Sequence, residues 1–142
     1  MPKKFAPRFA LTASMGALCL ALAPAALAAK SGGGGSGGGS SVSVVMVKDL
    51  NGNGLPNWGD TVTFDVSTSA PYPVVLLECY RNGALVFSQR AGFFPTYMWS
   101  KDFTLQSSSW TSGAADCTAT LYYSTRNGTN KTLATLSFHV EA

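Results

Sequence analysis

Hydrophobic and polar residues alternate one by one through much of the chain beyond residue 41, as in strands that bury one face. The alternating segments are short and are separated by Gly, Asn, Pro and Ser, which favour turns. No stretch of ten or more residues has the spacing of an amphipathic helix. The predicted strands lie near Val42 to Lys48, Thr61 to Ser67, Val74 to Arg81, Ala84 to Arg90, Lys101 to Gln106, Ala114 to Thr125 and Lys131 to Val140. This pattern predicts an all-β fold, an antiparallel β-sandwich of about seven strands.

Side-chain parity predicts which residues face the core, because successive side chains of a strand point to opposite faces. In the second predicted strand, Val62, Phe64 and Val66 share one face, and Thr and Asp residues occupy the other. Cys79 and Cys117 lie on the apolar faces of the third and sixth predicted strands. Both cysteines are therefore expected to point inward.

Two Asn-Gly pairs separate neighbouring strand segments, at residues 82–83 and 127–128. A two-residue hairpin turn requires positive φ, which Asn-Gly adopts at low cost. We therefore predict one hairpin from the third and fourth strands and another from the sixth and seventh.

Residues 1–29 have the three parts of a secretory signal peptide. A basic start with Lys3, Lys4 and Arg8 precedes an apolar run, and Ala-Leu-Ala at 26–28 provides a cleavage site. The apolar run has about 15 residues, fewer than the roughly 20 that span a bilayer. We expect the segment to be removed, which predicts a secreted, extracellular protein with no membrane insertion after cleavage.

The predicted linker occupies residues 30–41, of which 31–41 contain only Gly and Ser. This composition is typical of a flexible chain without a fold of its own. The folded part is then expected at residues 42–142, as a single domain with one core.

The net positive charge of the chain, +3, belongs to the predicted signal. Removing the signal removes three of the ten basic residues and none of the seven acidic ones, so seven charges of each sign remain. Nucleic acids and anionic membrane surfaces both attract clustered positive charge. Neither is expected as a partner.

Cys79 and Cys117 are the two cysteines that remain after Cys19 leaves with the signal. Exported proteins mature in oxidising compartments, so a disulfide between them is the expected state. It would close a loop of about 39 residues and stabilise the fold by roughly 3 to 4 kcal/mol. A reduced, buried pair of thiols is the alternative.

The connection between the first two predicted strands carries a recognisable pattern. Residues 49–54 read Asp-Leu-Asn-Gly-Asn-Gly, and residues 59–64 read Gly-Asp-Thr-Val-Thr-Phe. This stretch resembles the immunoglobulin-like, or fibronectin type III-like, domains of bacterial secreted and surface proteins. Residues 114–120, Ala-Ala-Asp-Cys-Thr-Ala-Thr, are similar to the sixth strand of these domains. The resemblance covers a short part of the chain and implies an immunoglobulin-like sandwich.

Two features depart from antibody-type domains. Those domains join their second and sixth strands by a disulfide and carry a Tyr two residues before the second Cys. Here that position is Ala115, and Cys79 lies on the third predicted strand. The disulfide would therefore join neighbouring strands of one sheet, and only the immunoglobulin-like architecture is expected.

The same connection has the spacing of a twelve-residue calcium loop, with Gly54 at its sixth position. Its candidate ligands are Asp49, Asn51, Asn53, the carbonyl of Leu55, Asn57 and Asp60. The flanking segments are strands rather than helices, and only two ligands are carboxylates. We therefore expect a weak extracellular site with a Kd of about 0.1 to 1 mM. The alternative is that the Asn-Gly pairs and the Pro only form turns.

The densest aromatic stretch, Phe-Phe-Pro-Thr-Tyr-Met-Trp at 93–99, lies between the fourth and fifth predicted strands. If exposed, Phe93, Phe94, Tyr97 and Trp99 would suit stacking on sugar rings or anchoring a protein partner. The alternative is that these rings cap one end of the sandwich. The partners considered are therefore an unidentified protein or a polysaccharide at the cell surface.

No catalytic site is expected. The single His139 lies on the last predicted strand, and no Ser or Cys has a base nearby in sequence. Hydrolysis of glycosides needs two carboxylates facing a cleft, whereas the acidic residues here are scattered. The sequence predicts a secreted, non-catalytic immunoglobulin-like module with a structural or surface-recognition role. The alternative is a carbohydrate-binding module that uses Phe94, Tyr97 and Trp99.

Overall fold

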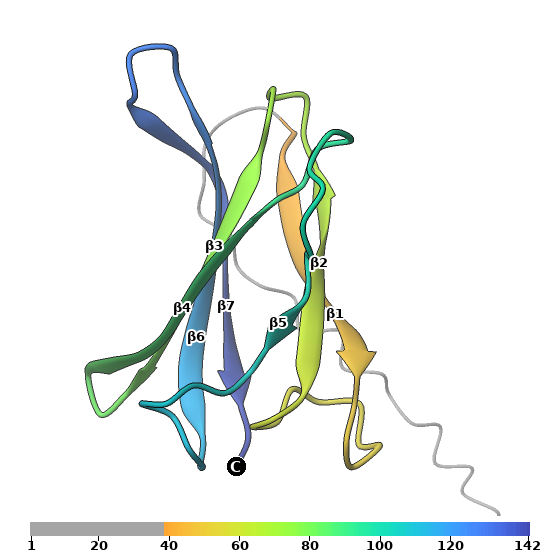
Figure 1. The fold of residues 1–142 in the computed structure, drawn as a ribbon, viewed down its shortest axis with the longest axis vertical. Helices are drawn as coiled ribbons and strands as arrows, with labels where there is room; N and C mark the ends of the chain where they lie inside the picture. Colours follow the sequence, from red (N-terminus) through yellow and green to blue (C-terminus); the bar gives the residue numbers. More distant parts are fainter. Residues whose placement is uncertain (1–38) are drawn as a thin grey trace, which may run out of the picture.

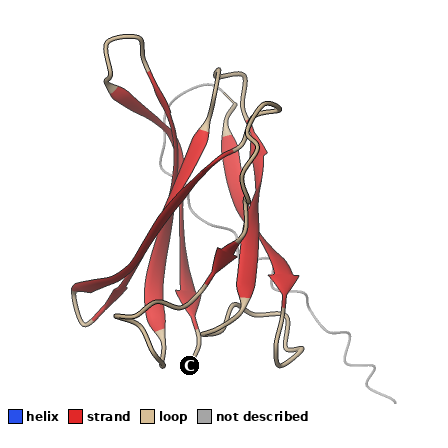
Figure 2. Ribbon diagram, in the orientation of Figure 1, coloured by secondary structure: helices blue, strands red, loops and turns tan. Residues whose placement is uncertain are grey.

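A computed structural model describes residues 39–142, which form strands and loops without a helix (Figure 2). The predicted signal peptide and residues 30–38 of the predicted linker lie outside this range. No helix of the described part is long and apolar enough to cross a membrane. The strands are β1 Ser41–Lys48, β2 Thr61–Ser67, β3 Val74–Arg81, β4 Ala84–Gly92, β5 Phe103–Thr104, β6 Ala115–Ser124 and β7 Asn130–Val140.

The seven strands form two antiparallel sheets that face each other (Figure 1). One sheet has the order β1-β2-β5, and the other has the order β4-β3-β6-β7. The chain passes from one sheet to the other three times, between β2 and β3, between β4 and β5, and between β5 and β6. The predicted all-β sandwich is confirmed.

The core lies between the sheets, and it is filled by the side chains that strand alternation predicted to face inward. Val62 and Phe64 on β2 are buried, and Val66 packs against the core from a half-buried position. Cys79 and Cys117 are buried as well. Full burial of one apolar side chain of this size contributes about 1.5 to 3 kcal/mol, so these inward rows hold the two sheets together.

A disulfide joins Cys79 and Cys117, as predicted. The two residues are direct partners in the register of β3 and β6, so the bond lies within one sheet. Contacts between the sheets are therefore non-covalent.

The β3–β4 hairpin turns at Asn82 and Gly83, with φ values of 50° and 78°, which confirms the predicted two-residue turn. The β6–β7 hairpin is also confirmed, but its predicted two-residue turn is wrong. There the amide of Gly128 donates to the carbonyl of Thr125, at 2.9 Å, and Asn127 does not adopt positive φ. The Thr125 hydroxyl accepts from the amide of Thr129, at 3.2 Å, and this bond favours the wider loop.

Several predicted strand boundaries differ from the structure by one or two residues, and the differences at the fifth and first strands have a visible cause. The fifth strand is only two residues long, because the amide of Gln106 donates to the carbonyl of Thr104 at 2.7 Å and bends the chain at Leu105. The first strand begins at Ser41, the last residue of the predicted linker. Ser40 also belongs to the fold, since its hydroxyl lies 2.9 Å from the Thr68 hydroxyl.

Candidate functional site

The aromatic stretch lies at one end of the sandwich, where it leaves β4 and meets the connection between β2 and β3. The amide of Phe93 donates to the carbonyl of Pro73 at 2.8 Å and ties the two connections together. A second bond, from the amide of Tyr97 to the carbonyl of Phe94 at 3.1 Å, closes a turn around Pro95. Backbone hydrogen bonds therefore fix the positions of both connections.

Phe93 belongs to the wall of the core. Its ring meets the ring of Phe64 edge to face, with centroids 6.4 Å apart. The ammonium of Lys101 lies over the Phe93 ring, 5.6 Å from its centroid. Of the four rings that the sequence singled out as binding residues, this one contacts the core most directly.

Four other rings form a row that we call the aromatic ladder: Tyr72, Phe94, Tyr97 and Trp99. Neighbouring ring centroids are 5.2, 5.5 and 5.3 Å apart along the row. Their planes meet at 84°, 73° and 61°, so the contacts are edge to face. The ladder is a series of ridges rather than a flat platform.

The ends of the ladder are open to solvent and its middle is supported. Tyr72 is 68% exposed and Trp99 is 73% exposed, whereas Phe94 and Tyr97 are half-buried. Gly92 lies beneath the middle rings, because a Cβ at this position would be 2.5 Å from atoms of both Phe94 and Tyr97. The two rings therefore rest directly on the Gly92 backbone, where only glycine fits without a shift.

Tyr72 is the ladder member that sequence reasoning missed. It lies between Pro71 and Pro73, outside any alternating pattern, and has a φ of 52°. A bulky residue in the left-handed region is an outlier that costs about 1 to 3 kcal/mol. The fold retains this conformation at a residue whose ring is exposed, a combination typical of functional loops.

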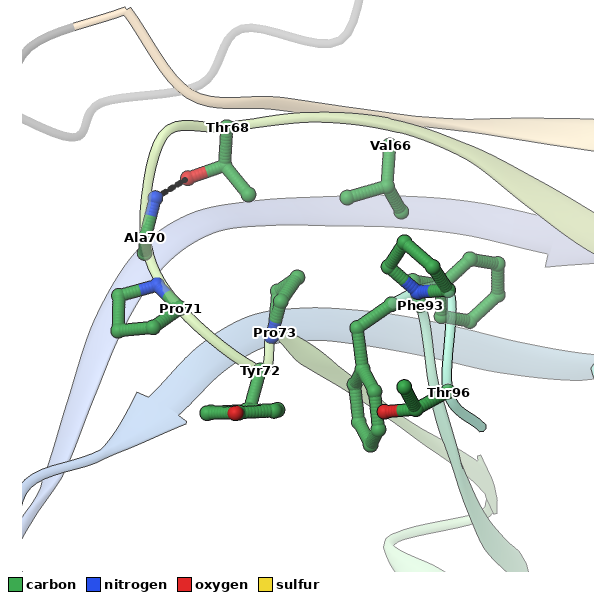
Figure 3. A pocket seen from close by; sticks show the side chains of 10 residues that line it. Val66, Thr68, Ala70, Pro71, Tyr72, Pro73, Phe93 and Thr96 are labelled. Atoms are coloured by element: carbon green, nitrogen blue, oxygen red, sulfur yellow. Dashed lines mark hydrogen bonds between the residues drawn. The ribbon is translucent and has the colours of Figure 1, made fainter. Parts of the chain in front are cut away.

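Two shallow grooves flank Phe94. The first has a volume of about 460 Å³. Figure 3 shows Pro71, Tyr72 and Pro73 on one of its walls and Phe93 and Thr96 on another. Rigid, mainly apolar walls with a few hydroxyl groups suit a ligand with apolar side chains.

The second groove lies on the other side of Phe94 and has a volume of about 430 Å³. Its lining includes Tyr97 and Trp99 from the ladder and Tyr122 from β6. Arg90 contributes a guanidinium, the charged group of this groove. The aromatic ladder thus presents one apolar groove and one groove that also carries a cation.

The predicted calcium loop lies at the opposite end of the sandwich (Figure 1). The two carboxylate oxygens of Asp49 accept from the amides of Gly52 and Gly54, each at 2.7 Å. Donation by these amides, above all Gly54, lowers the pKa of Asp49 below its ordinary value of 3.8. Asp49 therefore organises the first half of the loop.

Asp60 organises the second half. Its side chain is completely buried, and its two carboxylate oxygens accept from the amides of Leu50, at 2.8 Å, and Asn57, at 2.9 Å. These bonds satisfy the backbone amides of Asn57, in a buried position, and of Leu50, in a partly buried one.

The side-chain amide nitrogen of Asn57, Nδ2, lies between two of the predicted calcium ligands. It donates to the side-chain oxygen of Asn53 at 3.0 Å and to the carbonyl of Leu55 at 2.6 Å. The Asn51 oxygen accepts from the amide of Asn53 at 3.0 Å. The oxygen atoms of these residues suit calcium chemically. A cation between Asn53 and Leu55, however, would require the side-chain amide of Asn57 to rotate so that its oxygen, and not its nitrogen, faces the ion. Within residues 39–142, no three His, Cys, Asp or Glu side chains gather around a common point.

His139 lies on the outer face of the β4-β3-β6-β7 sheet. Its Nδ1 is 2.7 Å from a carboxylate oxygen of Asp116, its register partner on β6. Its Nε2 is 4.0 Å from a carboxylate oxygen of Glu141. The three groups are solvent-accessible, so the arrangement is a surface charge cluster.

Searches against protein-family models, curated proteins and solved structures found no match for this chain. Of the predicted binding residues, the structure brings Phe94, Tyr97 and Trp99 together and adds Tyr72.

Proposed function

We propose that this protein is an exported, non-catalytic immunoglobulin-like module that recognises a protein partner at the cell surface through its aromatic ladder. One observation carries the proposal: the ladder ends in two exposed rings, Tyr72 and Trp99, and borders two grooves. Aromatic side chains of this kind are enriched among the residues that dominate protein–protein binding energy.

The ladder is arranged before any partner binds, which reduces the entropic cost of association. Gly92 supports its middle rings, and the bond between Phe93 and Pro73 fixes the two connections that carry it. Trp110, by contrast, is fully buried and already fills the core. Exposure of Trp99 is therefore not explained by a need for bulk in the core.

The ring geometry favours a protein over a polysaccharide. Neighbouring planes meet at 61° to 84°, so a sugar chain finds no continuous flat face, whereas a protein segment can insert side chains between the ridges. The first groove is lined by proline and aromatic residues, with the hydroxyls of Thr68, Tyr72 and Thr96 as its side-chain polar groups. A carbohydrate-binding module remains the alternative, with the open face of Trp99 as its strongest element.

Strand order and sequence support the immunoglobulin-like and exported parts of the proposal. In constant-type immunoglobulin domains the fourth strand joins the first sheet, whereas β4 here pairs with β3. This arrangement agrees with the fibronectin type III-like form of the resemblance. The signal-like residues 1–29 and the disulfide both fit a bacterial protein that matures outside the cytoplasm.

The test compares retention of surface proteins and of polysaccharides from the producing organism on immobilised residues 30–142. Trp99→Ala is the test variant. Leu85→Ala is the matched control, because Leu85 is 49% exposed and lies at the other end of β4 from Gly92. Specific protein retention that only Trp99→Ala abolishes is expected. Trp99-dependent retention of polysaccharide would instead establish the alternative, and retention indifferent to both variants would refute a role for the ladder.

A further inference from the structure

We propose that β1 is a self-association surface, through which two copies of this protein pair their sheets edge to edge. The inference is independent of the aromatic ladder. It begins with backbone chemistry, because a strand at the edge of a sheet presents unpaired amide and carbonyl groups to any extended chain.

β1 is an open edge. It pairs with β2 on one side, and within residues 39–142 it forms no backbone hydrogen bond on the other. Its eight residues read Ser-Val-Ser-Val-Val-Met-Val-Lys, so the strand carries no charge before Lys48. Charged side chains, short length and bulges are the usual devices that block such edges. Here the charge lies at the very end, and the bulge falls between Met46 and Lys48.

The other sheet edges in the described part carry those devices. β5 has only two residues. β4 contains Arg90, and β7 contains Lys131 and His139. Of the four edges, β1 is the one that combines length with an uncharged, β-branched sequence, which favours strand pairing.

Exposed apolar side chains gather on the same strand and the loop that follows it. Val45 is 42% exposed and Val47 is 50% exposed on the outer face of β1. Leu50 and Leu55 in the following loop are 59% and 54% exposed. A partner strand laid against β1 would place its side chains beside Val45, and its backbone would bond to the free amide and carbonyl groups of β1.

A second copy of the same strand fits this edge. The flat part before the bulge runs from Val42 to Met46, and its centre is Val44. Antiparallel pairing about that centre places Val44 opposite itself, Val42 opposite Met46 and Ser43 opposite Val45. Inward residues then meet inward residues, and outward residues meet outward residues, as a continuous sheet requires. With seven charges of each sign beyond residue 29, net charge does not oppose the association.

Sedimentation velocity of residues 30–142 over a concentration series tests the proposal. We expect the mass to double as concentration rises. The double variant Ser43→Lys with Val45→Lys places like charges directly opposite one another and should weaken the dimer by at least about tenfold. Ser43→Glu with Val45→Lys places opposite charges in the same positions and should recover pairing. Ser43 and Val45 are both exposed, so neither double variant disturbs the core.

Two controls separate β1 from other surfaces. Leu85→Lys introduces the same charge at a comparably exposed position on β4, and Trp99→Ala removes the end of the aromatic ladder. Neither should change the dimer. A chain that stays monomeric throughout the series would overturn the proposal, as would dissociation by either control. Failure of the opposite-charge variant to recover pairing would overturn the register centred on Val44.

Discussion

The polar loop at 49–60 and the aromatic stretch at 93–99 lie at opposite ends of the sandwich and are stabilised in opposite ways (Figure 1). In the polar loop, oxygens of Asp49, Asn53 and Asp60 accept hydrogen bonds from within the loop itself. In the aromatic stretch, the backbone is fixed but large apolar rings remain in water. The polar groups of the loop find partners within it, whereas the aromatic end leaves the rings of Tyr72 and Trp99 exposed to solvent.

The largest expected effect concerns the polar loop. Asp60→Ala would remove the acceptor of two hydrogen bonds, a buried one from the backbone amide of Asn57 and a partly buried one from the backbone amide of Leu50. At about 1 to 3 kcal/mol for each, the free energy of unfolding should fall by roughly 2 to 6 kcal/mol. Urea denaturation measures this loss, with Asp65→Ala, an exposed acid on β2, as the control. A loss no greater than that of the control would mean that the loop is not organised by its buried carboxylate.

The next effect concerns the aromatic end. Gly92→Ala introduces a Cβ 2.5 Å from the rings of Phe94 and Tyr97 and should cost about 1 to 3 kcal/mol by overpacking. Near-ultraviolet circular dichroism should change with it, because the rings must move. Combining Gly92→Ala with Tyr97→Ala should recover part of the stability if the contact is the cause. Additive losses in the double variant would contradict direct support of the ring.

Adding calcium tests whether the polar loop binds a cation, although its oxygens already accept hydrogen bonds from within the loop. With a Kd of about 0.1 to 1 mM, roughly 10 mM calcium would raise the free energy of unfolding by about 1.4 to 2.7 kcal/mol. Thermal melts in excess calcium and in chelator measure the shift, which Asp49→Ala should abolish. Equal melting temperatures of the unmodified protein in both conditions would exclude binding at this strength.

The smallest expected effect is on acid stability. The pKa of Asp49 is lowered in the folded state, above all by the Gly54 amide, so the ionised carboxylate stabilises the fold. This contribution is complete above the ordinary pKa of 3.8 and is lost as pH falls through the lower folded pKa. As pH falls below 3.8, the unmodified protein should therefore lose more stability than Asp49→Asn. Parallel curves for the two proteins would contradict it.

Much of the fold was predictable because strands and tight turns depend on residues that are close together in the sequence. Alternation with period two correctly placed Val62, Phe64 and both disulfide cysteines on inward faces. Asn82-Gly83 also specified its turn, because positive φ at both residues is a local preference. Asn127-Gly128 did not, since the Thr125 hydroxyl and the neighbouring backbone select a longer loop.

The aromatic site was only partly predictable. The cluster of rings at 93–99 was visible in the sequence, but Tyr72 joins it from a connection more than twenty residues away. Its φ of 52° is imposed by tertiary structure between two prolines. Gly92 lies beyond the predicted fourth strand, which ended at Arg90, and its role as a support depends on rings that fold back over it. Contacts of this kind arise from chain paths that local patterns do not specify.

The disulfide also has a mechanical consequence. The covalent loop between Cys79 and Cys117 contains Phe94, Tyr97 and Trp99. A force that pulls the two ends of the folded chain apart can extend β1, β2, β7 and the parts of β3 and β6 outside the disulfide loop, but it cannot extend the segment between Cys79 and Cys117. Load applied to the ends of the folded chain would therefore bypass Phe94, Tyr97 and Trp99, whereas Tyr72 lies outside the loop and would be drawn out with the connection between β2 and β3.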